Sequence, residues 1–104
     1  MKTTTTTTNK SPNRFRIPRK VELGIISATD TARERLTQSD VLSALTRQAR
    51  GDWGEAPDWD LNDLALSVRG FVRGVYRAAS GIQFVVQTDL ARRATTVALP
   101  EDYA

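Results

Sequence analysis

The chain contains neither cysteine nor histidine among its 104 residues. Without cysteine there is no disulfide framework and no thiolate metal site. Without histidine the chain lacks the commonest general base at neutral pH and the commonest metal ligand. Catalytic pairs of serine or cysteine with histidine are therefore excluded, and we expect neither a bound metal nor a cofactor.

Long apolar runs and phosphate-binding loops are also missing. No apolar run approaches the roughly 18 residues of a membrane-spanning helix, and the N-terminal segment lacks the apolar core of a signal peptide. No glycine-rich loop is followed by lysine. We therefore expect a cytoplasmic, non-enzymatic protein that does not bind membranes. Paired carboxylates such as Asp52 with Asp63 remain open as a catalytic arrangement.

Positive charge is concentrated near the N-terminus. Residues 1–20 hold six basic residues and no acid, whereas residues 21–104 hold nine arginines against twelve acids, a net charge of −3. The basic segment includes a run of threonines and little apolar surface, so it predicts a disordered tail over residues 1–20 and a single domain over residues 21–104. The tail fits a weak contact with nucleic acid and equally an ordinary solubilising arm.

Helices are predicted in the first half of the domain, after a strand over residues 21–27. A short helix runs from Thr29 or Asp30 to Leu36, where the polar N-terminal residue is a typical cap. A second helix starts at Thr37 and Asp40, which resemble a capping box, and stops at Gly51. Its apolar face is predicted from residues at helical spacing: Val41, Leu42, Leu45 and Ala49.

A third helix is predicted between Asp58, its N-cap, and Gly70, its end. Its apolar face is predicted from Leu61, Leu64, Ala65 and Val68. The period then changes from helical to two over residues 71–78, 82–88 and 94–99, which predicts a three-strand antiparallel meander. The fold class is therefore α+β, with the helices on one face of the sheet.

Residues 50–60, RGDWGEAPDWD, contain both tryptophans and four acids. The order of Asp58, Asp60 and Asn62 matches the start of a calcium loop, but Asp63 stands where glycine is needed and Arg69 where glutamate is needed. We interpret the stretch as a joint between two helices. Three of its residues are expected to be structural, with the tryptophan filling the core: Gly51, Trp53 and Gly54.

One face of the predicted hairpin collects arginines and amides. Alternation places them on the side away from the helices, with two more arginines in the following turn: Arg73, Arg77, Gln83, Gln87, Arg92 and Arg93. Arginines and amides bind phosphates or acidic protein surfaces. A solvent-exposed face of an antiparallel sheet needs polar residues in any case, so a binding face and a solvated face both remain open.

Five parts of the sequence stand out together: LGIISAT at 23–29, RQARGDWG at 47–54, Asn62, YR at 76–77 and TDLARRATTVALPEDY at 88–103. They resemble a family of short bacterial proteins of unknown function, found on plasmids, phages and integrated elements and often labelled plasmid-related proteins. The resemblance covers most of residues 21–103 and implies a mobile-element context. Related chains commonly have histidine at the position of Gln48 and an acid at that of Ala91, so a histidine-dependent activity would be absent here.

The sequence thus predicts a mobile-element accessory protein that binds a protein partner through a surface, without catalysis. Two alternatives remain. The first is a toxin-like ribonuclease that stabilises a charged transition state on the meander. The second is a nucleic-acid binder that uses the basic tail and the arginine-bearing sheet face.

Overall fold

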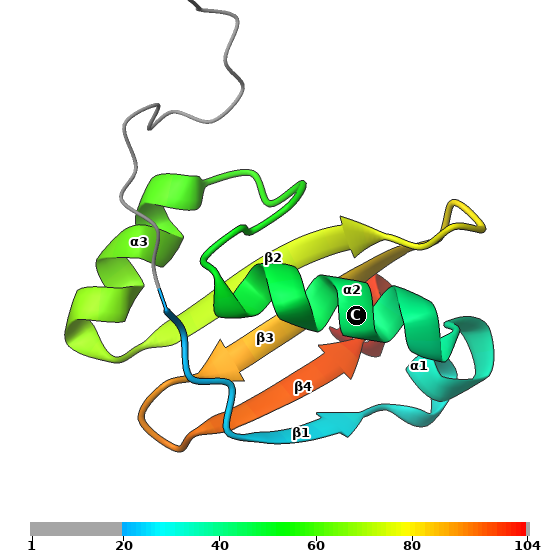
Figure 1. Ribbon diagram of the computed structural model, residues 1–104, viewed down its shortest axis with the longest axis horizontal. Coiled ribbons are helices and arrows are strands. Elements are labelled where there is room, and N and C mark those ends of the chain that lie inside the picture. The colour runs from blue at the N-terminus through cyan, green and yellow to red at the C-terminus, as the bar shows by residue number, and fades with distance from the viewer. Residues whose placement is uncertain (1–19, 104) are drawn as a thin grey trace, which may run out of the picture.

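The computed structural model describes residues 20–103, so the predicted tail lies almost entirely outside the described residues. The elements follow the order β1 (Ile25–Ala28), α1 (Asp30–Arg35), α2 (Gln38–Ala49), α3 (Trp59–Val68), β2 (Phe71–Arg77), β3 (Gln83–Asp89), β4 (Ala94–Ala98) and the 3-10 helix η2 (Pro100–Tyr103). Helices pack against one four-stranded sheet, which confirms the α+β class (Figure 1).

The sheet has the strand order β1-β4-β3-β2, so the predicted three-strand meander is only part of it. β2, β3 and β4 pair antiparallel as expected, but β1 joins the edge of β4 in parallel. The Ile25 N–H donates to the Arg93 carbonyl at 2.9 Å and the Thr29 N–H to the Val97 carbonyl at 3.0 Å. A pattern of alternating residues predicts a strand but not its partner, which is why this pairing was missed.

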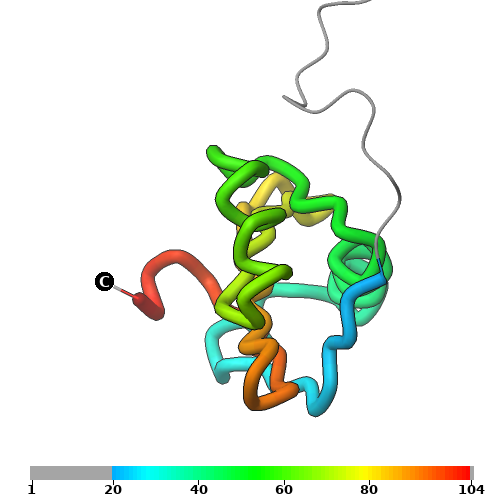
Figure 2. The backbone as a smooth tube through the Cα atoms, turned by 90° about the vertical axis from the view of Figure 1, so that its left-hand side faces the viewer, coloured from blue at the N-terminus to red at the C-terminus, as the bar shows by residue number. Residues whose placement is uncertain are grey.

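The main core lies between α2 and the sheet. The strand residues on the side opposite the arginines are buried there, among them Tyr76, Phe84 and Val86. Seen from the side, α2 and η2 lie on opposite sides of the sheet (Figure 2). The helices therefore do not all share one face, because the unpredicted η2 packs on the face that was expected to be open.

The helix caps are largely those predicted from sequence. The Thr29 side chain accepts a hydrogen bond from the Ala32 N–H, Thr37 and Asp40 form a capping box, and Asp58 caps α3. Gly51 has φ 75°, as expected for a helix-ending glycine. Helix α3 ends just before Gly70, as predicted, and its C-cap Arg69 has the left-handed conformation with φ 55°.

Helix α3 lies beside the edge of the sheet formed by β2, and it is rotated relative to the prediction. Its inner side packs through Trp59, Ala65 and Leu66 onto a small cluster around Trp53 and Val72. Leu61, Leu64 and Val68, predicted to be buried, are exposed. Asn62 fixes the rotation, since it is buried against β2 and bonds to that strand's backbone.

Candidate functional site

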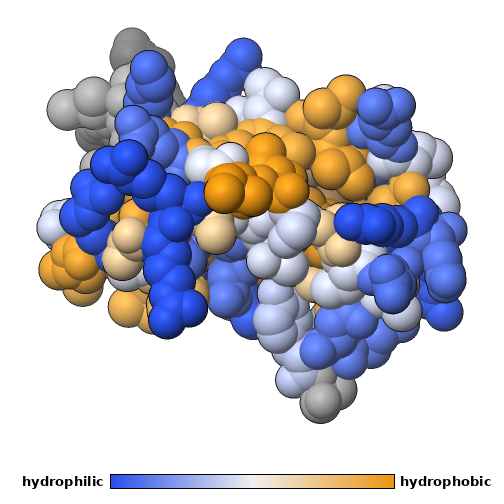
Figure 3. Space-filling view, turned by 90° about the horizontal axis from the view of Figure 1, so that it is seen from below, coloured by the Kyte–Doolittle hydropathy of each residue, from blue (hydrophilic) through white to orange (hydrophobic). Residues whose placement is uncertain are grey.

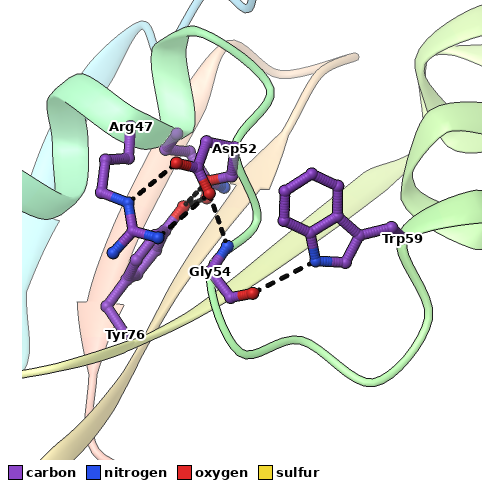
Figure 4. Close-up of polar contacts among 6 residues, drawn as sticks. Arg47, Asp52, Gly54, Trp59 and Tyr76 are labelled. Carbon is purple, nitrogen blue, oxygen red and sulfur yellow. Dashed lines mark hydrogen bonds and ion pairs between the residues drawn. The ribbon is translucent and has the colours of Figure 1, made fainter. Parts of the chain in front are cut away.

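The loop between α2 and α3 is organised by Asp52 (Figure 4). Arg47 donates two hydrogen bonds to its carboxylate, at 3.0 and 3.1 Å, and the Gly54 N–H donates a third at 3.0 Å. The Gly54 carbonyl accepts from Trp59 Nε1 at 3.2 Å. The pKa of Arg47 is raised above its usual value, mainly by the hydrogen bond to Asp52. These bonds make residues 50–60 a joint between the two helices.

Both tryptophans of the joint are anchored. Trp53 is fully buried, as expected for a core-filling residue, and its Nε1 donates to Asp63 Oδ1 at 3.0 Å. Trp59 is half-buried against the same cluster. Gly54 has φ 64°, and a Cβ there would lie 2.2 Å from the Val75 carbonyl oxygen, so the joint requires glycine at this point.

A buried polar network continues from the joint into the core. The Tyr76 hydroxyl contacts both Gln48 Oε1 and, at 2.7 Å, the Asp52 carbonyl, and burial raises the pKa of Tyr76 far above its usual value. Gln48 Nε2 donates to the Val86 carbonyl at 3.0 Å and to Thr88. Gln48 is fully buried, and these hydrogen bonds satisfy its amide within the core.

The outer edge of β2 forms backbone hydrogen bonds with this joint. Val75 N–H donates to the Trp53 carbonyl at 3.0 Å, and Glu55 N–H donates to the Val75 carbonyl at 2.6 Å. Further along the strand, Asn62 accepts from the Arg73 N–H at 3.0 Å and donates to the Arg73 carbonyl at 2.8 Å. The backbone groups that an edge strand offers to other chains are thus occupied along β2.

The arginine-bearing face is engaged internally. Arg73 donates to Gln87 Oε1 at 3.2 and 3.0 Å, and its Cζ lies 4.7 Å from the centre of the Tyr103 ring in η2. Arg77 forms a two-point pair with Glu55 at 3.2 and 2.9 Å, and Gln83 donates to the same carboxylate. The pKa of Glu55 is lowered below its usual value, mainly by the hydrogen bond from Arg77.

Arg92 and Arg93, the two remaining residues of the predicted binding set, lie away from this face. Arg92 is exposed in the β3–β4 turn, with its Nε 3.8 Å from Asp89 Oδ2. Arg93 lies beside a cavity that also involves α3. The structure therefore brings together Arg73 with Gln87 and Arg77 with Gln83, but it does not unite all six residues in one site. Sequence alternation gave no sign of Glu55 or Tyr103 as their partners.

A different surface has unpaired apolar side chains. On the outer side of α3, Leu61, Leu64 and Val68 are 62, 61 and 70% exposed. At 100° per residue the three lie within about 60° of one another around the helix axis. We refer to these three residues as the α3 stripe. Phe71, the first residue of β2, is also exposed.

A second apolar surface lies at the β1 edge, where Figure 3 shows hydrophobic atoms across the middle of the face. Ile25 and Ile26 are exposed there, and a groove of about 280 Å³ lies nearby, lined in part by Ala28, Leu36 and Val41. Ile25 and Ile26 are consecutive in a strand, so they point to opposite sides of the sheet. They do not form one continuous surface as the α3 stripe does.

Within residues 20–103, no group of three or more acidic side chains is placed to hold a metal ion. Among the helices in that range, none has the length and apolar character needed to cross a membrane.

Comparison of the chain with protein-family models, with curated proteins and with solved structures found no match.

Proposed function

We propose that this protein is a non-catalytic binding protein that docks on a protein partner through the α3 stripe. The observation that carries the proposal is that α3 is apolar on both sides. Its inner side packs on the Trp53 cluster, while the outer side presents Leu61, Leu64 and Val68 to solvent. The inner side is covered by other residues between 20 and 103, and in this proposal a protein partner covers the outer side.

The energetics support docking at this position. Burying an aliphatic side chain that is otherwise exposed contributes about 1.5–3 kcal/mol, so three such residues supply a substantial part of the affinity of an ordinary complex. The stripe is also presented rigidly. Asn62 ties α3 to β2 through two hydrogen bonds, and Trp53 ties the joint to Asp63. A preorganised surface loses little conformational entropy on binding.

The surroundings of the stripe indicate the chemistry of the partner. Asp58 and Asp60 are exposed at the start of α3, and Asp60 lies next to Leu64 around the helix axis. An apolar centre with acidic residues at its rim fits an apolar groove bordered by basic residues, since rim charges guide association and orientation. The resemblance to plasmid-related proteins suggests that the partner is a host protein or a protein of the mobile element.

The arginine-bearing face offers less support for the alternatives. A ribonuclease or a phosphate-binding face needs guanidinium groups that are available to a substrate. Arg77 is instead paired with Glu55, and Arg73 is held by Gln87 and Tyr103. Binding there would first have to break these contacts, whereas binding at the α3 stripe breaks none that the structure shows among residues 20–103.

The proposal is tested by comparing captured proteins between two variants. One carries Leu61→Gln, Leu64→Gln and Val68→Gln, and the matched control carries Leu42→Gln, which replaces an exposed leucine on α2. Glutamine keeps a high helix propensity, so neither variant should lose its helix. Each protein is immobilised at equal density, exposed to extract from the source organism, and the retained proteins are quantified by mass spectrometry.

We expect one or a few proteins to be retained by the wild type and by Leu42→Gln at equal levels, and to be absent from the triple variant. Circular dichroism should show the same helix content in all three. Equal retention by the triple variant would contradict the proposal, as would loss of binding by the Leu42→Gln control. Loss of self-association alone, measured by sedimentation, would instead identify the bound protein as a second copy of the chain.

A further inference from the structure

A cavity lies at the end of the molecule where residue 20 enters the fold. It has a volume of about 680 Å³, within the range of ligand-binding pockets. Its walls come from the segment before β1, from the end of α3 and from the two ends of the β3–β4 turn. Among residues 20–103, seven line it: Lys20, Val21, Glu22, Leu66, Arg69, Leu90 and Arg93.

The cations of this cavity differ from most others in the described chain. Arg35, Arg47, Arg77 and Arg92 each lie within 4 Å of a carboxylate. Lys20, Arg69 and Arg93 have no ion pair with any residue from 20 to 103. Their only described polar side-chain contact is a 3.5 Å bond from Arg69 to the Leu90 carbonyl. The lining therefore has three cations against one acid, Glu22.

The backbone at two of these cations is itself unusual. Arg69 and Arg93 both have φ 55°, and they are the only non-glycine residues from 20 to 103 with positive φ. The left-handed conformation costs a residue with a side chain roughly 1–2 kcal/mol relative to glycine. Two independent turns thus place arginine where glycine or asparagine would be more stable, and both side chains line the same cavity. Strained residues of this kind cluster at binding sites.

We propose that this cavity, which we call the cationic cavity, binds the phosphate groups of single-stranded nucleic acid. Arginine binds phosphate oxygens through two parallel hydrogen bonds, and lysine adds a point charge. The lining also includes three apolar residues, Val21, Leu66 and Leu90, of which Val21 and Leu90 are buried. A cavity of this size admits one or two nucleotides, whereas a rigid duplex reaches only its rim.

The charge of the sequence before Lys20 favours a strand over a free nucleotide. Lys20 lines the cavity, and residues 1–19 before it carry five further cations and no acid. A continuous polyanion can contact the cavity and that basic sequence together, but a single nucleotide cannot. This site is separate from the α3 stripe, so either proposal can fail without the other.

The test is fluorescence anisotropy with a labelled single-stranded oligonucleotide of about 12 nucleotides, a length typical of small strand-binding domains. The full-length wild type is compared with a double variant, Arg69→Asn with Arg93→Asn. Asparagine accepts the left-handed conformation more readily than arginine, so the double variant should melt at the same temperature or higher. The control, Arg33→Gln with Arg35→Gln, removes the same charge from α1, outside the cavity.

We expect the double variant to bind the strand at least about tenfold more weakly. The slope of log affinity against log salt should become shallower by about 0.7 for each phosphate that the two arginines bind in the wild type. The α1 control should stay within about twofold of the wild type, because both cavity arginines remain in place. An equal weakening in the control, or unchanged binding by the double variant, would overturn the proposal. So would a duplex or a nucleoside monophosphate that competes as well as the unlabelled strand, or a wild type that binds none of the three.

Discussion

Helix α3 has two apolar sides in different environments. On the inner side, Trp59, Ala65 and Leu66 pack against the cluster around Trp53. On the outer side, Leu61, Leu64 and Val68 remain more than 60% exposed. Both sides follow the helical period equally well. Periodicity therefore identifies an apolar surface, but it does not say whether the same chain covers it or another molecule does.

Helix α2 shows the ordinary case. Ala44 and Gln48 are buried and Val41 and Leu45 are half-buried against the main core, while the outer side is polar apart from Leu42. Removing apolar side chains from the outer side of α3 should therefore affect stability as little as removing Leu42 from α2. The variants below test this difference between covered and uncovered sides, in order of decreasing effect on the free energy of unfolding.

Removing the anchor of the inner side should have the largest effect. Trp53 is fully buried, so Trp53→Ala is expected to cost about 3–5 kcal/mol of unfolding free energy, the range for deleting a buried large aromatic. Trp59→Ala should cost less, since Trp59 is only half-buried. Urea unfolding measures both values. If Trp59→Ala proved the more destabilising, the joint would not be held mainly by Trp53.

The attachment of α3 to β2 should come next. Asn62 is buried and satisfies both backbone groups of Arg73, so Asn62→Ala leaves a donor and an acceptor of the edge strand without their partner. We expect a loss of about 2–3 kcal/mol in the same urea experiment, since each unsatisfied group costs about 1–3 kcal/mol. A loss below about 0.5 kcal/mol, the range of neutral surface changes, would show that Asn62 does not fix the rotation of α3.

The outer side should contribute little to the stability of the free protein. The triple replacement of the α3 stripe by glutamine is expected to change the free energy of unfolding by no more than about 1 kcal/mol, because surface substitutions rarely exceed about 0.5 kcal/mol each. Leu42→Gln provides the comparison on α2. A loss of several kcal/mol in the triple variant would mean that the stripe packs within the chain itself.

The smallest expected effect concerns the start of α2. The pKa of Asp40 is held below its usual value, first by the Ala79 N–H and then by Thr37. Such a carboxyl stabilises the fold at pH values above its unfolded pKa, and this contribution is lost as the pH falls through the folded pKa. Asp40→Asn should lower the melting temperature slightly at pH 7, and the difference should disappear on acidification. A difference in melting temperature that stays constant as the pH is lowered through the acidic range would contradict this account.

Local sequence signals predicted much of the fold. The capping residues Thr37 and Asp58, the strand alternation around Tyr76 and the burial of Trp53 are all found in the structure. The predictions that failed concern contacts between residues far apart in the sequence. The parallel pairing of β1 with β4 depends on hydrogen bonds such as that from Ile25 to Arg93, which no local pattern encodes.

The surfaces were harder to predict than the elements. The rotation of α3 is set by the bonds between Asn62 and Arg73, and an asparagine in a helix gives no sequence signal for such a contact. The arginines on β2 satisfied the alternation rule, but their partners, Glu55 and Tyr103, come from the joint and from the C-terminal 3-10 helix. Sequence could place these arginines on a face without showing that the face is already occupied.

The most direct test of the α3 stripe is photo-crosslinking inside cells of the source organism. A photoreactive phenylalanine analogue replaces Leu64 in one variant and Leu42 in a second, and both are illuminated at equal expression. The account predicts a discrete crosslinked product with another protein from position Leu64 and none from position Leu42. The absence of a product at Leu64, or the same product at both positions, would contradict the claim that the outer side of α3 is where this protein binds its partner.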